Sequence, residues 1–154
     1  MPARAKIISK LLPVLIFILT TSAVMAASGK LIDVTIKNVS AKNIEMIGLL
    51  INGVPGFPVE TLQLKNMQFE LPGGGKAEDA KNQLPEKEKA YPEFNMFGKI
   101  MPAYGIYARH LRGVKFQNVR ITVKTPDARP AKIFVDVEGV TPVGFVPAPT
   151  MAAQ

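Results

Sequence analysis

The stretch Ile36-Lys37-Asn38-Val39 occurs twice more with small changes, as Leu64-Lys65-Asn66-Met67 and Phe116-Gln117-Asn118-Val119. The three asparagines are separated by 28 and then 52 residues, and 52 is twice 26. A fainter copy, Val137-Glu138-Gly139-Val140, follows Leu111-Arg112-Gly113-Val114 at half of the longer separation. Strand-like units that recur every 26–28 residues are typical of a solenoid, in which each coil buries its apolar face against its neighbours.

The residues before each asparagine alternate between apolar and polar. Val34, Ile36 and Asn38 would share one face of a strand, so the pattern predicts a strand that ends at an inward turn, where Asn tolerates left-handed geometry. In coils stacked about 4.8 Å apart, equivalent asparagine amides can hydrogen-bond as a ladder. The alternative is three unrelated strand-end asparagines. The predicted fold is all-β, a right-handed parallel β-helix of about three to four coils with one long inserted loop.

Residues 1–26 have the features of a secretory signal peptide, and we expect them to take no part in that fold. A basic lead precedes an apolar stretch of 14 residues, which is shorter than the ~20 that a membrane span needs. Cleavage is predicted after Ala26, and an uncleaved anchor is the alternative. The mature chain is then a β-helix fragment over residues 27–146 with a flexible tail over 147–154. It is expected to be secreted or periplasmic, without membrane contact after cleavage.

Charge and composition exclude several kinds of site. Cleavage removes three basic residues and no acidic one, so the formal charge falls from +7 to +4, which would mildly favour a polyanionic partner. No run of Lys and Arg with interleaved aromatic residues is present, which argues against nucleic-acid binding. The chain has no Cys, so disulfides, thiol catalysis and Cys-based metal sites are excluded. The sequence predicts neither a metal nor a cofactor.

The predicted coils cover residues 31–51, 53–71, 103–123 and, in part, 131–145. Residues 73–100 separate the second coil from the third; they open with three glycines and have no strand period. We expect a long surface loop that buries little and that proteases cut first, between residues 76 and 99. A full coil without its asparagine would fit the longer asparagine spacing but not this composition.

Alternation in the last two coils predicts an outward row of side chains. Tyr107 and Arg109 would point outward in the third coil, and Lys132, with Phe134 and Asp136, would do so in the fourth. Tyr107, Arg109 and Lys132 are therefore candidate substrate-binding residues, because aromatic faces stack on sugar rings and cations pair with carboxylates. The alternative is an ordinary solvated sheet face.

Longer stretches resemble a known family. Pro102-Ala103-Tyr104-Gly105-Ile106-Tyr107-Ala108-Arg109-His110, together with residues 113–119 and 126–131, is similar to the C-terminal coils of bacterial glycoside hydrolase family 28, the polygalacturonase-like pectin hydrolases. Residues 71–75, 91–93 and 96–98 resemble the insertion that those proteins carry. The resemblance covers about residues 30–147. It implies a β-helix and pectic polysaccharide (galacturonan) as the substrate class.

The catalytic motifs of that family are absent. Asn-Thr-Asp, an Asp-Asp pair, Gly-His-Gly and Arg-Ile-Lys carry its chemistry, and none occurs in this sequence, so the resemblance implies no catalytic residue and no activity for the chain alone. Asp136 and Glu138 share a strand face, with Cα atoms roughly 6.6–6.8 Å apart, although such carboxylates more often form a solvated face. His110, the one histidine, is predicted to be a hydrogen-bonding residue rather than a base or metal ligand. Asp127 and Arg129, which lie between prolines, are predicted to pin a turn.

Three functions remain open at this point. The chain is the C-terminal part of a secreted pectin-active glycoside hydrolase without its catalytic acids, or a non-catalytic carbohydrate-binding or interaction module, or a structural remnant that needs another chain. The first coil would expose a strand edge, so self-association through it is expected in each case.

Overall fold

The computed structural model describes residues 17–19, 31–87 and 96–147, and this part of the chain contains strands, one short 3-10 helix and no α-helix. The strands are β1 (Phe17–Leu19), β2 (Thr35–Lys42), β3 (Leu49–Asn52), β4 (Val59–Gly73), β5 (Ile106–Thr125) and β6 (Lys132–Val146), and the helix is η1 (Ala77–Lys81). Within these residues no helix has the length and apolar character needed to cross a membrane. The prediction of an all-β chain is confirmed.

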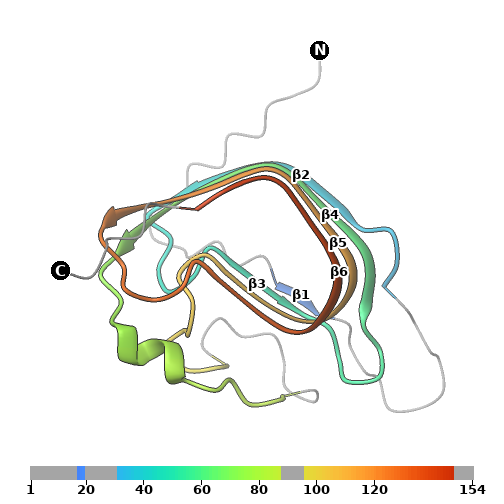
Figure 1. Cartoon of the computed structure of the whole chain (residues 1–154), viewed down its shortest axis with the longest axis horizontal. Coiled ribbons are helices and arrows are strands. Elements are labelled where there is room, and N and C mark those ends of the chain that lie inside the picture. Colours follow the sequence, from blue (N-terminus) through green and yellow to red (C-terminus); the bar gives the residue numbers. More distant parts are fainter. Residues whose placement is uncertain (1–16, 20–30, 88–95, 148–154) are drawn as a thin grey trace.

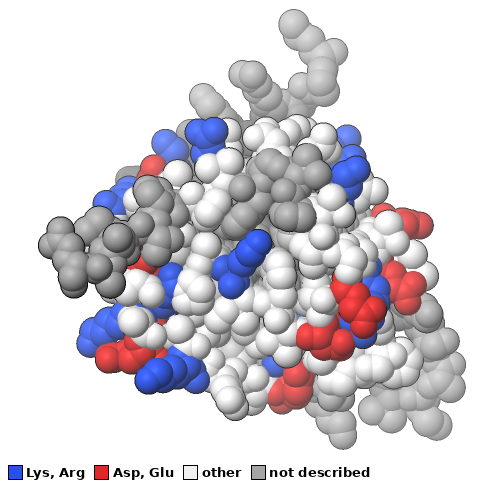
Figure 2. All heavy atoms as spheres, viewed as in Figure 1, with Lys and Arg blue, Asp and Glu red and all other residues white. Residues whose placement is uncertain are grey.

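All strands belong to one parallel sheet that curls (Figure 1). β2, β4, β5 and β6 lie side by side in that order, while β1, β3 and the first part of β5 form a second row. Each pass of the chain across both rows is called a rung, so β3 and β4 together form one rung and β5 forms the next. The long strands bend through a common arch, and Figure 2 shows Lys and Arg atoms along its upper rim.

The registers confirm the repeat that the sequence predicts. Ile36 pairs with Leu64, and Leu64 pairs with Phe116, at the same two separations as the asparagines. Leu111 pairs with Val137 at half of the longer separation. Side chains of paired residues in parallel strands point to the same face of the sheet. The apolar positions of each copy therefore stack on those of the next.

The three asparagines form the predicted ladder. Asn66 Nδ2 donates to Asn38 Oδ1 at 3.1 Å, and Asn118 Nδ2 donates to Asn66 Oδ1 at 3.0 Å. All three have left-handed backbone, with φ values of 62°, 53° and 53° in chain order. The prediction of an inward turn at a strand end is wrong, because the strands continue past each asparagine and the ladder is exposed. The left-handed residue bends the strand instead of ending it.

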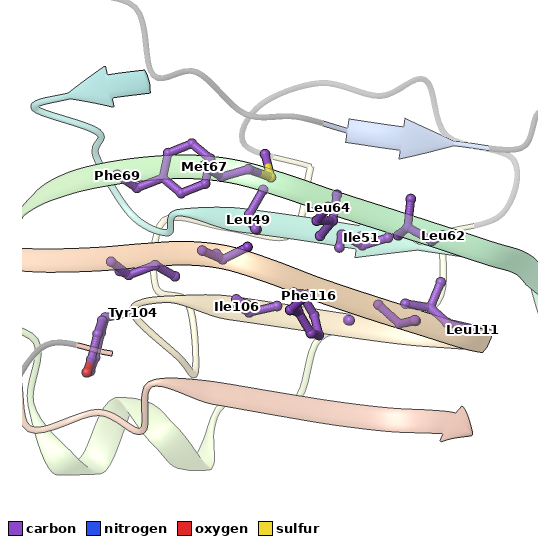
Figure 3. Packing of buried hydrophobic residues seen from close by; sticks show 14 of the residues in the cluster. Leu49, Ile51, Leu62, Leu64, Met67, Phe69, Tyr104, Ile106, Leu111 and Phe116 are labelled. Carbon is purple, nitrogen blue, oxygen red and sulfur yellow. The ribbon is translucent and has the colours of Figure 1, made fainter. Parts of the chain in front are cut away.

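The main core lies inside the curl of the sheet (Figure 3). Leu64 and Phe69 of β4 and Phe116 of β5 enter it from one row, and Leu49 and Ile51 of β3 enter it from the other. Each of these side chains is at most 2% exposed. Burial of such a side chain contributes about 1.5–3 kcal/mol, so the facing rows stabilise the curl.

Residues 74–105 connect β4 to β5, and their described parts, 74–87 and 96–105, place apolar residues against the outer side of the sheet. Their described parts contain η1 and no strand, so the alternative of a full extra coil is wrong for residues 74–87 and 96–105. Leu84, Met96 and Phe97 form a second buried cluster with residues of the sheet, Leu50 and Tyr107 among them. The prediction that this segment buries little is therefore wrong. Its apolar residues are irregularly spaced among charges, so no period signals their burial.

Two predicted boundaries differ from the structure. Leu49 pairs with Ile106, which places β3 in one rung with β4, so the predicted first coil, residues 31–51, ends too late. Phe17–Leu19 pair with residues 50–52, so part of the predicted signal peptide lies on the sheet. The rest of residues 1–26, residues 88–95 of the expected protease-sensitive region and residues 148–154 of the predicted tail lie outside the described residues. Cleavage after Ala26 stays a prediction.

Candidate functional site

A pocket of about 600 Å³ lies on the outer side of the sheet, between β5, β6 and the segment that follows η1. β5 contributes Tyr107 and Arg109 to its lining, and β6 contributes Ile133 and Val135. The other lining residues are Ala80, Lys81, Asn82, Gln83, Leu84, Glu86 and Pro102. The pocket thus combines an aromatic and apolar floor with amide, ammonium and carboxylate groups, which is typical of small-molecule sites.

Arg109 is buried beneath the segment rather than open to solvent. Its Nη1 donates to the carbonyl oxygen of Leu84 at 3.1 Å, and its Nη2 donates to that of Pro85 at 3.0 Å. The guanidinium also pairs with Glu86 Oε1 at 3.1 Å and lies 5.1 Å from the centre of the Phe97 ring. These contacts occupy the cation, so Arg109 holds the wall of the pocket in place instead of offering a free charge to a ligand.

Tyr107 points outward as predicted but is only 5% exposed, because the same segment covers it. Burial raises the pKa of its hydroxyl, and the neighbouring Arg109 opposes that rise. The phenol is therefore protonated at neutral pH and can donate a hydrogen bond. Because it lines the pocket, Tyr107 is within reach of a ligand that binds there.

Lys132 does not join this row. It pairs with Ile106, whose side chain is in the main core, whereas Tyr107 pairs with Ile133 and Arg109 pairs with Val135. Residues 132–135 are therefore phased opposite to the prediction: Ile133 and Val135 lie on the outer side, and Phe134 packs against the main core. The repeat itself requires this phase, because residue 132 is the equivalent of residue 106.

His110 lies between two carboxylates next to the pocket. Its Nδ1 is 2.7 Å from Asp136 Oδ2, and its Nε2 is 3.1 Å from Glu86 Oε1. His110 and Asp136 are equivalent positions of successive rungs, and both have left-handed backbone, with φ values of 54° and 51°. The prediction of a hydrogen-bonding histidine is confirmed, and the contact with Glu86 fastens the segment over the sheet.

Asp136 and Glu138 do not form a free acid pair. Arg112 contacts both, with Nη2 at 2.7 Å from Asp136 Oδ1 and Nε at 3.4 Å from Glu138 Oε2. Hydrogen bonds from His110 and then Arg112 lower the pKa of Asp136, which favours a paired carboxylate over a proton donor. Among the described residues, no group of three or more His, Asp or Glu side chains could hold a metal ion.

Asp127 and Arg129 pin the turn before β6, as predicted. Arg129 Nε and Nη2 donate to the two carboxylate oxygens of Asp127 at 2.9 and 2.7 Å, and Arg129 Nη1 reaches the carbonyl oxygens of Met46 and Met101. Burial raises the pKa of Asp127, but the hydrogen bonds from Arg129 outweigh burial and leave the pKa low. The backbone N–H of Gly75 also donates to Asp127, so one ion pair joins several connecting segments.

Sequence reasoning missed the wall of the pocket. Glu86, Leu84 and Lys81 come from the segment that was predicted to be an open loop. The signal for it was a few large apolar residues within a charged stretch, Leu84, Met96 and Phe97 among them, and such residues give no indication of what they pack against.

Comparison of the chain with protein-family models, with curated proteins and with solved structures finds no match.

Proposed function

We propose that this chain is the C-terminal part of a secreted or periplasmic polygalacturonase-like protein of glycoside hydrolase family 28, and that it binds galacturonan without cleaving it. The observation that carries the proposal is the pocket beside Tyr107, on the outer side of the rung whose sequence, residues 102–110, resembles that family.

The proposal includes the fold: we infer that the curled parallel sheet is the end of a right-handed parallel β-helix. Successive rungs pair in register, and residues 43–48 and 126–131, six residues each, return the chain from one rung to the next. Crossover connections between parallel strands are right-handed in about 98% of cases. Left-handed residues recur at equivalent positions, Thr61, Gly113 and Gly139 as well as the asparagines, so each rung bends at the same places.

The pocket offers chemistry that suits a uronic acid residue. Lys81 can pair with a carboxylate, Gln83 can hydrogen-bond to hydroxyl groups, and Tyr107 with Ile133 gives an apolar floor. Asn82 contributes less, because its Nδ2 already donates to the carbonyl oxygen of Ile100. Arg109, which the sequence suggested as the partner of a sugar carboxylate, supports the wall instead.

The same pocket lacks the groups for hydrolysis. An inverting glycosidase needs two carboxyl groups about 6.5–9.5 Å apart, one as acid and one to activate water. Among the described residues, Glu86 is the one acidic residue in the lining, and it is paired with Arg109 and His110. Without a second carboxyl group, a glycosidic bond has neither a proton donor nor an activated nucleophile.

Short galacturonate oligomers, titrated calorimetrically into the purified protein, test the proposal. We expect weak binding that falls with added salt and no release of reducing sugar. Lys81→Ala should weaken binding roughly threefold, the effect of losing an exposed ion pair of about 0.7 kcal/mol. Lys76→Ala is the matched control, because Lys76 adjoins η1 but does not line the pocket.

Equal loss of affinity in the Lys81 and Lys76 variants would show that the pocket is not the binding site. Release of reducing sugar would overturn the proposal that the chain does not cleave galacturonan. Absence of any binding would favour the second candidate, a purely structural end module. That candidate is supported by the buried Arg109 and Asp127–Arg129 contacts, which hold the connecting segments on the sheet.

A further inference from the structure

A basic patch lies on the outer side of the arch, away from the pocket. We call it the lysine facet; it is bounded by the left-handed residues Thr61 and Gly113 on one side and by the asparagine ladder on the other. Its outward side chains alternate with inward apolar residues along β2, β4, β5 and β6. They are Thr35, Lys37, Gln63, Lys65, Lys115, Gln117 and Thr141. Within these bounds the described residues include three lysines and no carboxylate, and the exposed Asp33, the equivalent of Thr61, lies at the edge of the facet.

The three lysines are close neighbours. Lys37 pairs in register with Lys65, so their backbones are one strand spacing apart, about 4.8 Å. Lys115 pairs with Gln63, two residues before Lys65, which places it diagonally next to Lys65 on the same face. None of the three makes an ion pair with another described residue.

This arrangement works against folding. Like charges directly opposite one another on neighbouring strands destabilise a sheet. Two other cations on the sheet surface do have acidic partners: Arg112 contacts Asp136 and Glu138, and Lys124 contacts Glu70. The facet is thus an unbalanced positive surface built from regular strand positions, which an external polyanion would neutralise.

We propose that the lysine facet binds a linear acidic polysaccharide. The lysines can pair with regularly spaced anionic groups, while the neighbouring Gln63, Gln117 and Thr35 can hydrogen-bond to sugar hydroxyls. The facet carries no aromatic side chain among its described residues, so it lacks the stacking platform on which single-stranded nucleic acids depend. This inference extends the proposed function with a second contact surface, and it stands or falls separately from the pocket.

The positive surface continues beyond the asparagine ladder. Lys42 and Arg120 are exposed on the next part of the arch, where Arg120 is in register with Ser40 and Gln68, and Lys42 is in register with Glu70. A chain of several sugar units could therefore meet Arg120 as well as the three lysines of the facet, which is why long chains should bind better than short ones.

The experiment compares two triple variants of the full chain. Lys37→Gln/Lys65→Gln/Lys115→Gln removes three charges from the facet, and Lys76→Gln/Lys87→Gln/Lys99→Gln removes three from the segment between β4 and β5. Binding of long-chain polygalacturonate is measured across a salt series. The facet variant should bind at least tenfold more weakly and lose about two units from the slope of log K against log salt, given ~0.7 per contact for a flexible polyanion. The control variant should change the affinity by no more than twofold and should leave the slope close to that of the wild type.

Stability gives a second readout. Because the lysines repel one another, the urea midpoint of the facet variant should equal or exceed that of the wild type, so weaker binding cannot come from unfolding. A lowered midpoint would mean that the lysines have a structural role, and would overturn the proposal. So would equal loss of binding in the two triple variants.

Three ligands separate the remaining explanations. Short galacturonate oligomers report on the pocket, and their binding should be unaffected by the facet variant, so the two proposals fail independently. Dextran sulfate should compete with polygalacturonate if charge density is what the facet recognises, and neutral dextran should not. Stronger binding of duplex DNA than of either polysaccharide at equal salt would overturn the choice of ligand class.

Discussion

His110 contacts a carboxylate with each ring nitrogen, Asp136 through Nδ1 and Glu86 through Nε2. Each ring nitrogen of an imidazole can take part in one hydrogen bond, so His110 bridges a carboxylate of β6 and one of the segment that follows η1. Arg109 and Arg112 lie beside it, and each is paired with one of the same carboxylates. His110 therefore helps to fasten residues 82–87 to the sheet.

The depressed pKa of Asp136 predicts how stability depends on pH. Because its pKa is lower in the folded chain than in the unfolded chain, where it is about 3.9, its contribution is fully present above that value and is lost as the pH falls through the folded pKa. Asp136→Asn should thus be less stable than the wild type at pH 6, and the difference should shrink below about pH 4. Urea unfolding at several pH values measures this. Asp33→Asn, at another exposed left-handed position, is the control, and a gap independent of pH would contradict the assignment.

At the scale of single residues, the sequence predicted contacts between near neighbours better than it predicted the side of the sheet on which a side chain lies. Asp127 and Arg129 pin their turn as expected, since the two side chains are only two residues apart. Lys132 was placed on the wrong side because alternation was counted from within its own coil. The left-handed Asp136 interrupts that alternation, and only the repeat offset from Ile106 gives the correct phase.

At the scale of the strands, the asparagine ladder separates two contributions to stability. Asn66→Ala removes amides that bond to both Asn38 and Asn118 and also places a Cβ-bearing residue without a local hydrogen bond at φ 53°. Asn66→Gly removes the same amides but tolerates that backbone. We expect the alanine variant to be less stable than the glycine variant by about 1 kcal/mol, the cost of left-handed geometry.

Chemical unfolding of both variants measures this difference. Asn38→Gly is a useful comparison, because Asn38 at the end of the ladder takes part in one of the two amide contacts rather than both, so it should lose less than Asn66→Gly. Equal stability of the alanine and glycine variants at residue 66 would show that backbone geometry contributes little there.

The sequence predicted the strands, but it did not predict that the segment between β4 and β5 packs over them. The spacing of the asparagines predicted which residues pair, because register follows from a repeat. Tyr107 and Arg109 are buried by Leu84 and Phe97, which come from a connecting segment with no period. Contacts between a repeat and an irregular insertion depend on shape rather than on pattern, so the sequence alone could not reveal them.

At the scale of the whole molecule, the two outer strands of the long row have open edges. Among the described residues, β2 pairs only with β4, and β6 pairs only with β5. Apolar residues at these ends, such as Val34 and Val137, are only partly buried. Removal of residues 1–26 would also take away β1 and free an edge of β3. Such edges are templates for pairing with another chain.

We therefore expect residues 27–154 to self-associate as concentration rises, as measured by light scattering. Val146→Lys, at an exposed position on β6, should weaken association, because a lysine on an edge strand opposes pairing. Ile100→Lys changes an equally exposed apolar residue away from the strand edges and serves as the control. A monomer over the whole concentration range would contradict the prediction.

The in-register stack also limits how the chain can change length during evolution. One residue inserted within β5 would turn every following side chain to the opposite face until the next left-handed position, exchanging core for surface. A whole repeat unit, equal in length to the offset between Leu111 and Val137, could be duplicated or deleted with every remaining pair preserved. The six-residue returns 43–48 and 126–131 leave little room for other changes, whereas residues 74–105 show where irregular sequence has been accommodated. Related sequences should thus differ in length by whole rungs or by insertions in the segments that connect the rungs.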